Sequence, residues 1–364
     1  MEAAGNFCVR RTRAVLTALG CIVFLICPVT GARAQTQLFT VTDFAFEDGS
    51  ALPDVHIAYE TRGTLSPAHD NAIVLVPGAA ADRHAFDPLI GPGKLFDTNR
   101  YFVISVDPLG GGESTSPADG MGQEFPRYTI RDMMELQQAL VTRGLGIARV
   151  RAVIGQSMGS FIALEWGIHH PETIGGLVLM APSPKADPAF RLTIDLITGS
   201  IALDPEWQGG HYSHNPVEGL RHAGMLFYPW VVSGAYIDRI GSEAAAREIE
   251  TSAATYAAWD ANALMLRMAA YHAHDVSAPF EGDMTAALAR VKAPTLILTC
   301  SSDRLVGLGG ATRIIAGVPR ATYEEIASDL GHRALRATPG TTEGDKIADF
   351  IGRFLATLGP VTGH

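Results

Sequence analysis

Short apolar runs alternate with amphipathic stretches from residue 72 to residue 358, a pattern typical of a buried parallel sheet flanked by helices. The apolar runs predict strands at 72–76, 101–106, 150–154, 176–180, 295–299 and 321–326. Two antiparallel strands are predicted ahead of them, at 39–46 and 55–61. The amphipathic stretches predict helices at 131–143, 160–169 and 345–358. This alternation indicates an α/β fold with a mostly parallel, doubly wound sheet.

One long interval contains no strand-like run. Residues 187–288 read as helical and loop material, rich in Ala, Met, Trp and Tyr. We expect this interval to be a helical cap inserted between two strands. The core would then consist of residues 35–186 and residues 289–364.

Residues 1–34 are typical of a secretory signal peptide. Three arginines at positions 10 to 13 precede an apolar run at 14–29, and an Ala-x-Ala sequence ends at Ala34. The run is too short to span a bilayer comfortably. We therefore expect cleavage after Ala34 and an exported protein, periplasmic or secreted, with no membrane span. An uncleaved N-terminal anchor is the alternative.

Composition restricts the classes of protein that fit. Hydrophobic residues make up 47% of the 364 residues and charged residues 18%, so the chain can form a large core and is not typical of a disordered protein. The formal net charge of −10 argues against nucleic acid or an anionic membrane as the main partner. Cys300 is the single cysteine after residue 34, so we expect no intrachain disulfide and a buried thiol.

Ser157 lies between a predicted strand and a predicted helix, in Gly155-Gln156-Ser157-Met158-Gly159. The G-x-S-x-G string alone is weak, because a glycine-rich chain produces it by chance. In a strand–turn–helix context it is typical of a strained elbow that exposes the serine hydroxyl at the carboxyl edge of the sheet. There the helix dipole favours a developing negative charge. We predict that Ser157 is a nucleophile; an ordinary turn serine is the alternative.

A serine nucleophile needs a base, and the base needs a carboxylate to orient it. His332 follows the last predicted strand, where this arrangement places its base. Asp303 follows the strand predicted at 295–299 and is the expected carboxylate. Asp329 competes for that role, but it is only three residues from His332. The chain order Ser157, Asp303, His332 is that of an α/β-hydrolase.

An oxyanion hole needs two backbone N–H groups. Met158 directly follows the nucleophile and would supply one. The loop after the strand at 72–76 would supply the other, from Ala79 or, as a second choice, Ala80. Small side chains in this loop would let an acyl carbonyl approach.

We expect no metal and no cofactor. His211 with His214, and His272 with His274, lack a third ligand at a recognisable spacing. The sequence contains no phosphate-binding loop and no dinucleotide fingerprint. The expected partner is a small-molecule ester, and a homodimer is compatible with the sequence.

Several motifs spread over residues 40–355 carry a family resemblance. They are Gly91-Pro92-Gly93-Lys94, the stretch 97–103, Ser157-Met158-Gly159, the stretches 163–166 and 204–207, Gly209-Gly210 and Gly331-His332. On these motifs the chain resembles the homoserine O-acetyltransferase branch of the α/β-hydrolase superfamily. The resemblance implies the α/β-hydrolase fold, a helical cap, and the triad Ser157, Asp303 and His332.

The chain also departs from that pattern. In the acyltransferases it resembles, an Asp directly after the catalytic His and a cap Arg are thought to hold the amino and carboxylate groups of the acceptor. Here Arg333 follows His332, and Gly224 stands in place of the cap Arg. Losing both residues should remove that recognition, unless the nearby Arg221 compensates.

Export and the altered acceptor site together favour water as the acceptor, because acetyl-CoA is a cytoplasmic donor. The sequence therefore predicts an exported serine hydrolase acting on carboxylic esters through an acyl-enzyme. The aromatic residues Trp207, Phe227, Tyr228 and Trp230 would shape the cap pocket or form the core of the cap. The alternative is an O-acyltransferase of the homoserine acetyltransferase type acting on a different acceptor.

Overall fold

The computed structural model describes residues 35–359, and these form an eight-stranded sheet with strand order β1-β2-β4-β3-β5-β6-β7-β8. The strands are β1 (Gln37–Ala45), β2 (Ala51–Arg62), β3 (Ala72–Val76), β4 (Phe102–Val106), β5 (Ala152–Gln156), β6 (Leu177–Met180), β7 (Thr295–Cys300) and β8 (Ala321–Ile326). β1 pairs with β2 and β2 with β4 in antiparallel fashion, and every later pair is parallel. The predicted mostly parallel α/β sheet is confirmed. The predicted signal peptide, residues 1–34, lies outside the described residues.

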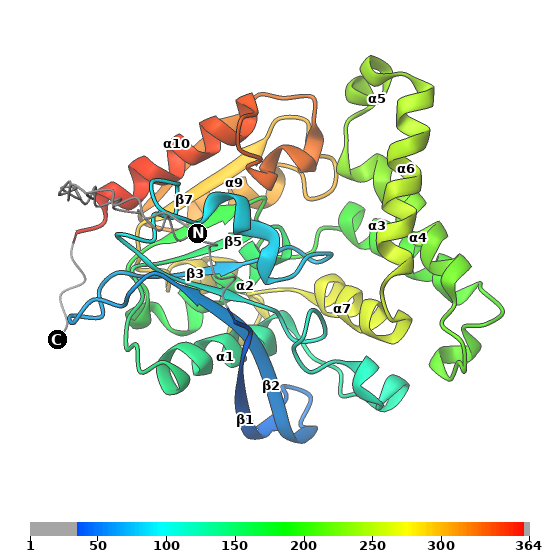
Figure 1. Cartoon of the computed structure of the whole chain (residues 1–364), viewed down its shortest axis with the longest axis horizontal. Coiled ribbons are helices and arrows are strands. Elements are labelled where there is room, and N and C mark those ends of the chain that lie inside the picture. The colour runs from blue at the N-terminus through cyan, green and yellow to red at the C-terminus, as the bar shows by residue number, and fades with distance from the viewer. Residues whose placement is uncertain (1–34, 360–364) are drawn as a thin grey trace, which may run out of the picture. The chain divides into compact units, whose positions relative to one another are not determined.

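Helices lie on both sides of this sheet, with α1 (Ile130–Ala139) and α2 (Met158–His169) on one side and α10 (Thr342–Thr357) on the other (Figure 1). Every residue of β3, β6 and β7 is buried, which explains why these strands read as continuous apolar runs in the sequence. α9 (Gly309–Gly317) also packs beside β7 and β8.

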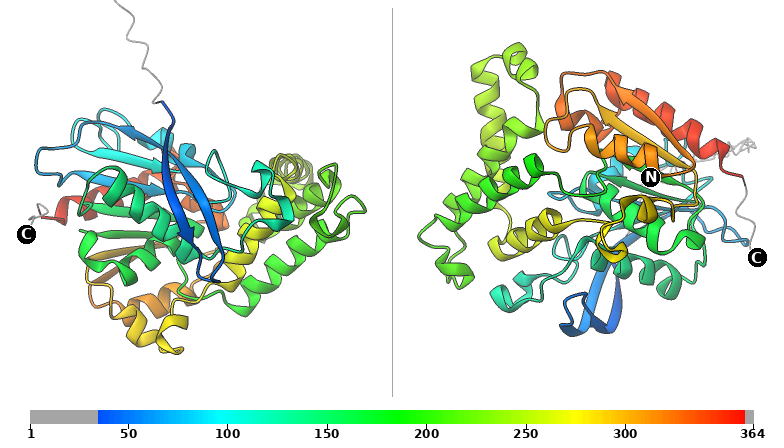
Figure 2. Two further views of the ribbon diagram at one scale, coloured as in Figure 1. Left: turned by 90° about the horizontal axis from the view of Figure 1, so that it is seen from below. Right: turned by 180° about the vertical axis from the view of Figure 1, so that it is seen from behind.

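Six helices lie between β6 and β7 within residues 187–288. They are α3 (Pro188–Ala202), α4 (Val217–Val231), α5 (Gly234–Ile240), α6 (Ser242–Ala257), α7 (Ala261–Ala273) and α8 (Met284–Leu288). α3 to α7 gather at one end of the sheet, where α4 packs against α3 and α6 (Figures 1 and 2). We refer to α3 to α7 as the cap. α8 packs instead against α9 in the core.

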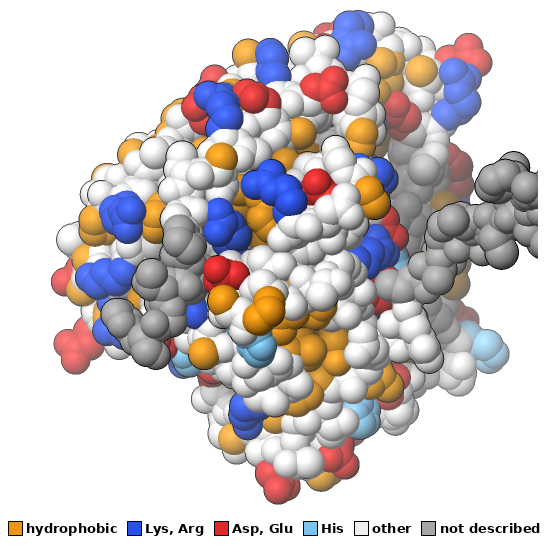
Figure 3. Space-filling view, turned by 60° about the vertical axis from the view of Figure 1, so that its left-hand side comes forward, with side chains coloured by type: hydrophobic (Ala, Val, Ile, Leu, Met, Phe, Trp, Pro, Cys, Tyr) orange, Lys and Arg blue, Asp and Glu red, His pale blue; other side chains and the backbone are white. Residues whose placement is uncertain are grey.

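The surface carries charges of both signs. On the face shown in Figure 3, Lys and Arg side chains are interspersed with Asp and Glu, and hydrophobic side chains lie between them. Among the helices described, none is both long enough and apolar enough to cross a membrane.

Candidate active site

Ser157 occupies a strained turn between β5 and α2. Its φ of 53° and ψ of −121° are unusual for a residue with a side chain. The flanking glycines make this turn possible: a Cβ on Gly155 would collide with the Gly159 carbonyl oxygen, and a Cβ on Gly159 with the Val76 carbonyl oxygen. The Ser157 N–H donates to Met180 O on the neighbouring strand at 2.8 Å. The turn thus holds the hydroxyl at the carboxyl edge of the sheet.

The structure brings Ser157, His332 and Asp303 into one hydrogen-bonded chain. His332 lies after β8 in the short helix η8 (Gly331–Arg336), with Nε2 2.9 Å from Ser157 Oγ. Its Nδ1 lies 2.7 Å from Asp303 Oδ2. With Nδ1 protonated, His332 donates to Asp303, and Nε2 can accept the serine proton. All three residues are buried.

The other oxygen of Asp303 is also engaged. Asp303 Oδ1 accepts the N–H groups of Leu305 at 2.9 Å and Val306 at 3.2 Å. Its competitor Asp329 instead accepts from Arg239 on α5, at 2.6 Å from Nε and 2.9 Å from Nη2. Only Asp303 is therefore placed to orient His332.

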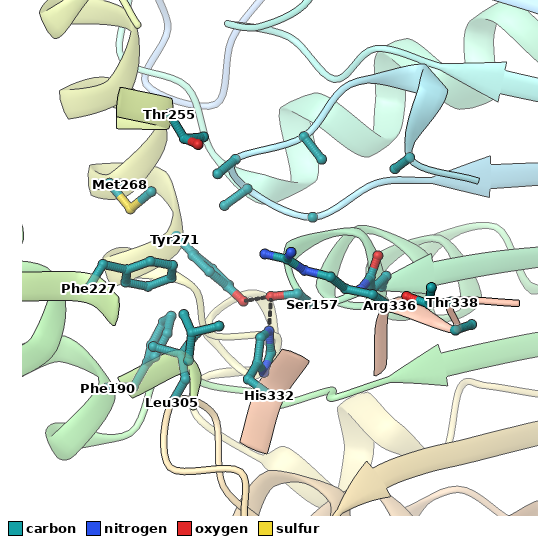
Figure 4. A pocket seen from close by; sticks show the side chains of 18 of the residues that line it. Ser157, Phe190, Phe227, Thr255, Met268, Tyr271, Leu305, His332, Arg336 and Thr338 are labelled. Carbon is teal, nitrogen blue, oxygen red and sulfur yellow. Dashed lines mark hydrogen bonds between the residues drawn. The ribbon is translucent and has the colours of Figure 1, made fainter. Parts of the chain in front are cut away.

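The cap contributes a further contact to the nucleophile, which the sequence analysis missed. Tyr271 on α7 has its hydroxyl 3.1 Å from Ser157 Oγ (Figure 4). Burial raises the Tyr271 pKa, so the phenol stays protonated and can donate to Oγ while Oγ donates to His332. The signal that could have found it is the helical spacing of Leu264, Met268 and Tyr271, which places these residues on one face of α7.

The predicted oxyanion groups also lie at this site. Met158 is the first residue of α2, and the first N–H groups of a helix have no partner within it. Ala79 lines the cavity beside Ser157, and a Cβ on Gly78 would touch Ser157 Cβ at 3.4 Å. The loop is therefore close enough to the nucleophile for Ala79 to act with Met158.

A buried arginine of the cap holds the Ala79 loop in place. Arg267 on α7 is fully buried and donates to Ala79 O at 2.8 Å. It also donates to Pro108 O and Leu109 O, both at 3.2 Å. Burial lowers the Arg267 pKa, and its guanidinium lies over the Trp259 ring. The sequence analysis gave this residue no role.

A cavity of about 470 Å³ opens onto Ser157 between the core and the cap. Its lining is largely apolar, and Phe190, Phe227 and Leu305 lie on one side of the serine (Figure 4). Of the four aromatic residues proposed to shape this pocket, only Phe227 lines it.

The acceptor-binding residues expected from the resemblance are not at the cavity. Arg333 pairs with Glu248 at 2.6 Å, and its guanidinium lies over the Tyr236 ring. Arg221 pairs with Glu250 and Glu218 and does not line the cavity, so it does not replace the missing cap arginine.

Within residues 35–359, no group of three or more His, Cys, Asp or Glu side chains could hold a metal ion. Cys300 is buried and free, and burial raises the pKa of its thiol. Neither feature adds chemistry to the site of Ser157.

Comparisons with known proteins identify relatives along most of the chain. A family model described as "alpha/beta hydrolase fold" matches residues 71–335. A homoserine O-acetyltransferase of Carboxydothermus hydrogenoformans is 31% identical, covering 88% of this chain and 95% of that protein. A homoserine O-succinyltransferase of Laribacter hongkongensis is 33% identical, covering 82% and 90%.

Two solved structures share the fold. An acetylester hydrolase of Corynebacterium glutamicum has a TM-score of 0.83 at 25% identity, covering 89% of this chain and 96% of its own. A homoserine O-acetyltransferase of Bacillus anthracis has a TM-score of 0.75 at 27% identity, covering 91% and 99%.

These relatives overturn the main functional prediction. The exported ester hydrolase is wrong as the leading interpretation, because homoserine O-acetyltransferases and O-succinyltransferases match nearly the whole chain and favour the acyltransferase alternative. The physical reason is that hydrolysis and transfer share one nucleophile and one acyl-enzyme, so the triad does not discriminate between them. The preference for water rested on the export predicted from residues 1–34, which lie outside the described residues, and on the altered acceptor residues at 224 and 333, which do not distinguish water from another hydroxyl acceptor.

The resemblance stated from the motifs is confirmed over the length of the chain. The family model indicates the α/β-hydrolase fold, and both the sequence relatives and the solved structures include homoserine O-acetyltransferases. The chain is an enzyme of the α/β-hydrolase fold family and belongs to its homoserine O-acyltransferase branch.

Proposed function

We propose that the protein is an O-acyltransferase that carries the acyl group on Ser157 and passes it to a hydroxyl acceptor other than homoserine. The observation that carries the acyl-enzyme chemistry of this proposal is the hydrogen-bonded chain from Ser157 through His332 to Asp303 beside a largely apolar cavity. The acyltransferase relatives support transfer over hydrolysis.

The reaction has two matched halves. Ser157 Oγ attacks the acyl carbonyl while His332 Nε2 takes its proton, and the proton then goes to the leaving group of the donor. The acceptor hydroxyl next attacks the acyl-enzyme and gives its proton to His332, which returns it to Ser157. Asp303 holds the imidazole orientation throughout, and the N–H groups of Met158 and Ala79 would stabilise both oxyanions.

The proposal of a different acceptor rests on two positions. Arg333 stands where the family carries an acid, and its charge is paired with Glu248. Gly224 stands where the family carries an arginine, and a Cβ there would lie 2.5 Å from Ser252 O on α6. A larger side chain at 224 would therefore require α4 and α6 to separate.

The test is a product analysis. The protein is incubated with p-nitrophenyl acetate and alcohol acceptors, homoserine among them, and acetylated acceptor and free acetate are both quantified. We expect transfer to exceed hydrolysis with at least one acceptor and homoserine not to be the best. Ser157→Ala should lower both products by about 10⁴-fold or more. Release of acetate alone with every acceptor would contradict the proposal.

A further inference from the structure

One charged side chain faces the cavity of Ser157 and has no role in the proposed chemistry. Among the described residues that line this cavity, Arg336 is the only Lys, Arg, Asp or Glu. It ends the η8 helix that carries His332. In Figure 4 its guanidinium lies above Ser157, whereas Phe190 and Leu305 lie below the level of the serine. The cavity therefore has an apolar side and a positively charged side.

The charge of Arg336 is not neutralised within residues 35–359. The Arg336 side chain is exposed, and its guanidinium makes no hydrogen bond and no ion pair with a described residue. The charge of Glu248 favours the Arg336 cation, but this carboxylate makes no hydrogen bond or ion pair with Arg336 and is already occupied. It accepts from Arg333 at 2.6 Å, Tyr236 at 2.7 Å and Tyr228 at 2.9 Å.

The surroundings disfavour this cation while the cavity holds no anion. Burial lowers the Arg336 pKa, and the like charge of Arg333 lowers it further. The side chain is still open to the cavity, so its donors can be reached by a ligand. An anion placed there would gain charge-assisted hydrogen bonds without displacing an existing protein partner.

We propose that Arg336 binds a carboxylate of the substrate while Ser157 holds the acyl group, so that the enzyme prefers an anionic substrate over its neutral isostere. A planar guanidinium matches a carboxylate through two parallel hydrogen bonds. The carboxylate belongs either to the acyl group or to the acceptor, and the experiment below distinguishes these sources. This inference rests on the proposed acyltransferase function.

Binding is measured first, because it does not depend on turnover. In the Ser157→Ala background, monomethyl succinate and its neutral counterpart dimethyl succinate are titrated with detection by ligand-observed NMR. Replacing Arg336 with Gln should weaken binding of the monoanion at least tenfold relative to the diester. Arg336→Lys, which keeps the charge but not the planar fork, should lose less than Arg336→Gln.

Kinetics then locate the carboxylate. One arm compares p-nitrophenyl hydrogen succinate with p-nitrophenyl acetate as donors. The other compares 3-hydroxybutanoate with 1,3-butanediol as acceptors from a fixed neutral donor. In the arm that holds the true source, Arg336→Gln should lower the ratio of kcat/KM for the anionic over the neutral substrate at least tenfold. The matched control Arg221→Gln removes the same charge from an exposed pair outside the cavity and should leave every ratio unchanged.

The outcomes separate the two proposals. If Arg336→Gln lowers anionic and neutral substrates equally, or lowers neither, carboxylate recognition is overturned while acyl transfer stands. If wild type transfers no acyl group but the binding ratio falls with Arg336→Gln, the proposed function fails and the anion site stands. If Arg221→Gln lowered the anionic-to-neutral ratio of kcat/KM as much as Arg336→Gln does, the preference would be explained by the net charge of the protein. That result would overturn the assignment of carboxylate binding to Arg336.

Discussion

The hydroxyl of Ser157 is shared between His332 of the core and Tyr271 of the cap, at 2.9 and 3.1 Å. A serine hydroxyl carries one proton. When Oγ donates that proton to His332, the phenol of Tyr271 must be the donor of the second hydrogen bond. The reactive oxygen is thus oriented from two sides before a substrate arrives, and the Tyr271 hydroxyl lies where charge changes as Oγ attacks and leaves.

Tyr271→Phe should slow acyl-enzyme formation by about tenfold, because one hydrogen bond to the reacting oxygen is lost. Stability should change little, since the ring still packs against Phe161 and Phe190 at centroid distances of 4.7 and 4.6 Å. The burst of p-nitrophenol from an activated ester measures the step, and thermal unfolding is the control. An unchanged burst rate would show that the phenol serves packing alone.

Local sequence carries the signal for some of these side chains and not for others. Ser157 is marked by glycines within two residues on each side, which the turn itself requires. Tyr271 and Arg336 are 114 and 179 residues away from Ser157, and they meet it only through tertiary packing. The helical spacing of Leu264, Met268 and Tyr271 indicates the buried face of α7 but not a contact with Ser157, and Arg336 has no spacing that distinguishes it from a surface residue.

Helices α4 and α6 touch at Gly224. A Cβ there would lie 2.5 Å from Ser252 O and 2.9 Å from Ala253 Cα, both of them backbone atoms that cannot rotate away. The Ser252 hydroxyl in turn donates to Gly224 O at 2.7 Å. The helix pair therefore depends on a residue without a side chain.

Gly224→Ala should destabilise the fold by about 1–3 kcal/mol, the usual range for overpacking a tight contact. The matched control is Gly199 of α3, where a Cβ meets nothing within 4 Å. Gly199→Ala should stabilise by up to about 1 kcal/mol, because alanine is the better helix former. Urea unfolding of both variants measures the difference. Equal effects of the two substitutions would refute the packing account of α4 and α6.

The sequence was sufficient for elements whose burial shows in their pattern. The runs at 72–76 and 321–326 match β3 and β8 to the residue, and the predicted hairpin corresponds to β1 and β2. The short helix α9 was missed because it has nine residues, with glycine at both ends. Helix propensity predicts little over so short a stretch. The helix is stabilised instead by packing against β7 and β8.

The cap is joined to the core by ion pairs on both sides of His332. Asp329, ahead of the histidine, pairs with Arg239 of α5, and Arg333, directly after it, pairs with Glu248 of α6. A Cβ on Gly331 would lie 2.7 Å from Val231 O of α4, so the backbone also approaches the cap closely here. His332 therefore lies on a segment of the core that contacts the cap on both sides of it.

Glu248→Gln should destabilise the protein by about 1–2 kcal/mol at pH 7, because the charge of Arg333 loses its partner. Burial raises the Glu248 pKa, but hydrogen bonds from Tyr236, Arg333 and Tyr228 outweigh it, and the net pKa is lowered. A carboxylate whose pKa is lower in the folded state than in the unfolded state stabilises the fold at any pH above its unfolded-state pKa. That contribution to the free energy of unfolding is lost as the pH falls through the folded-state pKa. The difference between wild type and variant should therefore shrink below about pH 4.5.

Urea unfolding from pH 7 to pH 3.5 measures this dependence. Arg239→Gln is the comparison, because its pair with Asp329 is more exposed and such pairs contribute less, about 0–1 kcal/mol. A gap between wild type and Glu248→Gln that is constant with pH would contradict the role assigned to the carboxylate.

For the whole molecule, the fold and the family could be predicted from the sequence, but the preferred acceptor could not. Ser157, Asp303 and His332 follow the ends of β5, β7 and β8, and the apolar runs in the sequence predict these strands. The cap side chains that line the cavity could not be predicted either, because only Phe227 of the four aromatic residues considered does so. That arrangement follows from helix crossings, which one sequence does not specify.

Arg267 joins the cap to the loops of the core that lie beside the active site. Its guanidinium donates to the carbonyls of Ala79, Pro108 and Leu109, and so connects α7 to two loops of the core. In a chimaera that takes α7 from a homologue without this arginine, the Ala79 loop would lose its hydrogen bond to the cap and become more mobile. This would happen even if Ser157, His332 and Asp303 were unchanged. Recombination between relatives should therefore succeed when the crossover points keep α7 together with its native loops, and fail when they divide them.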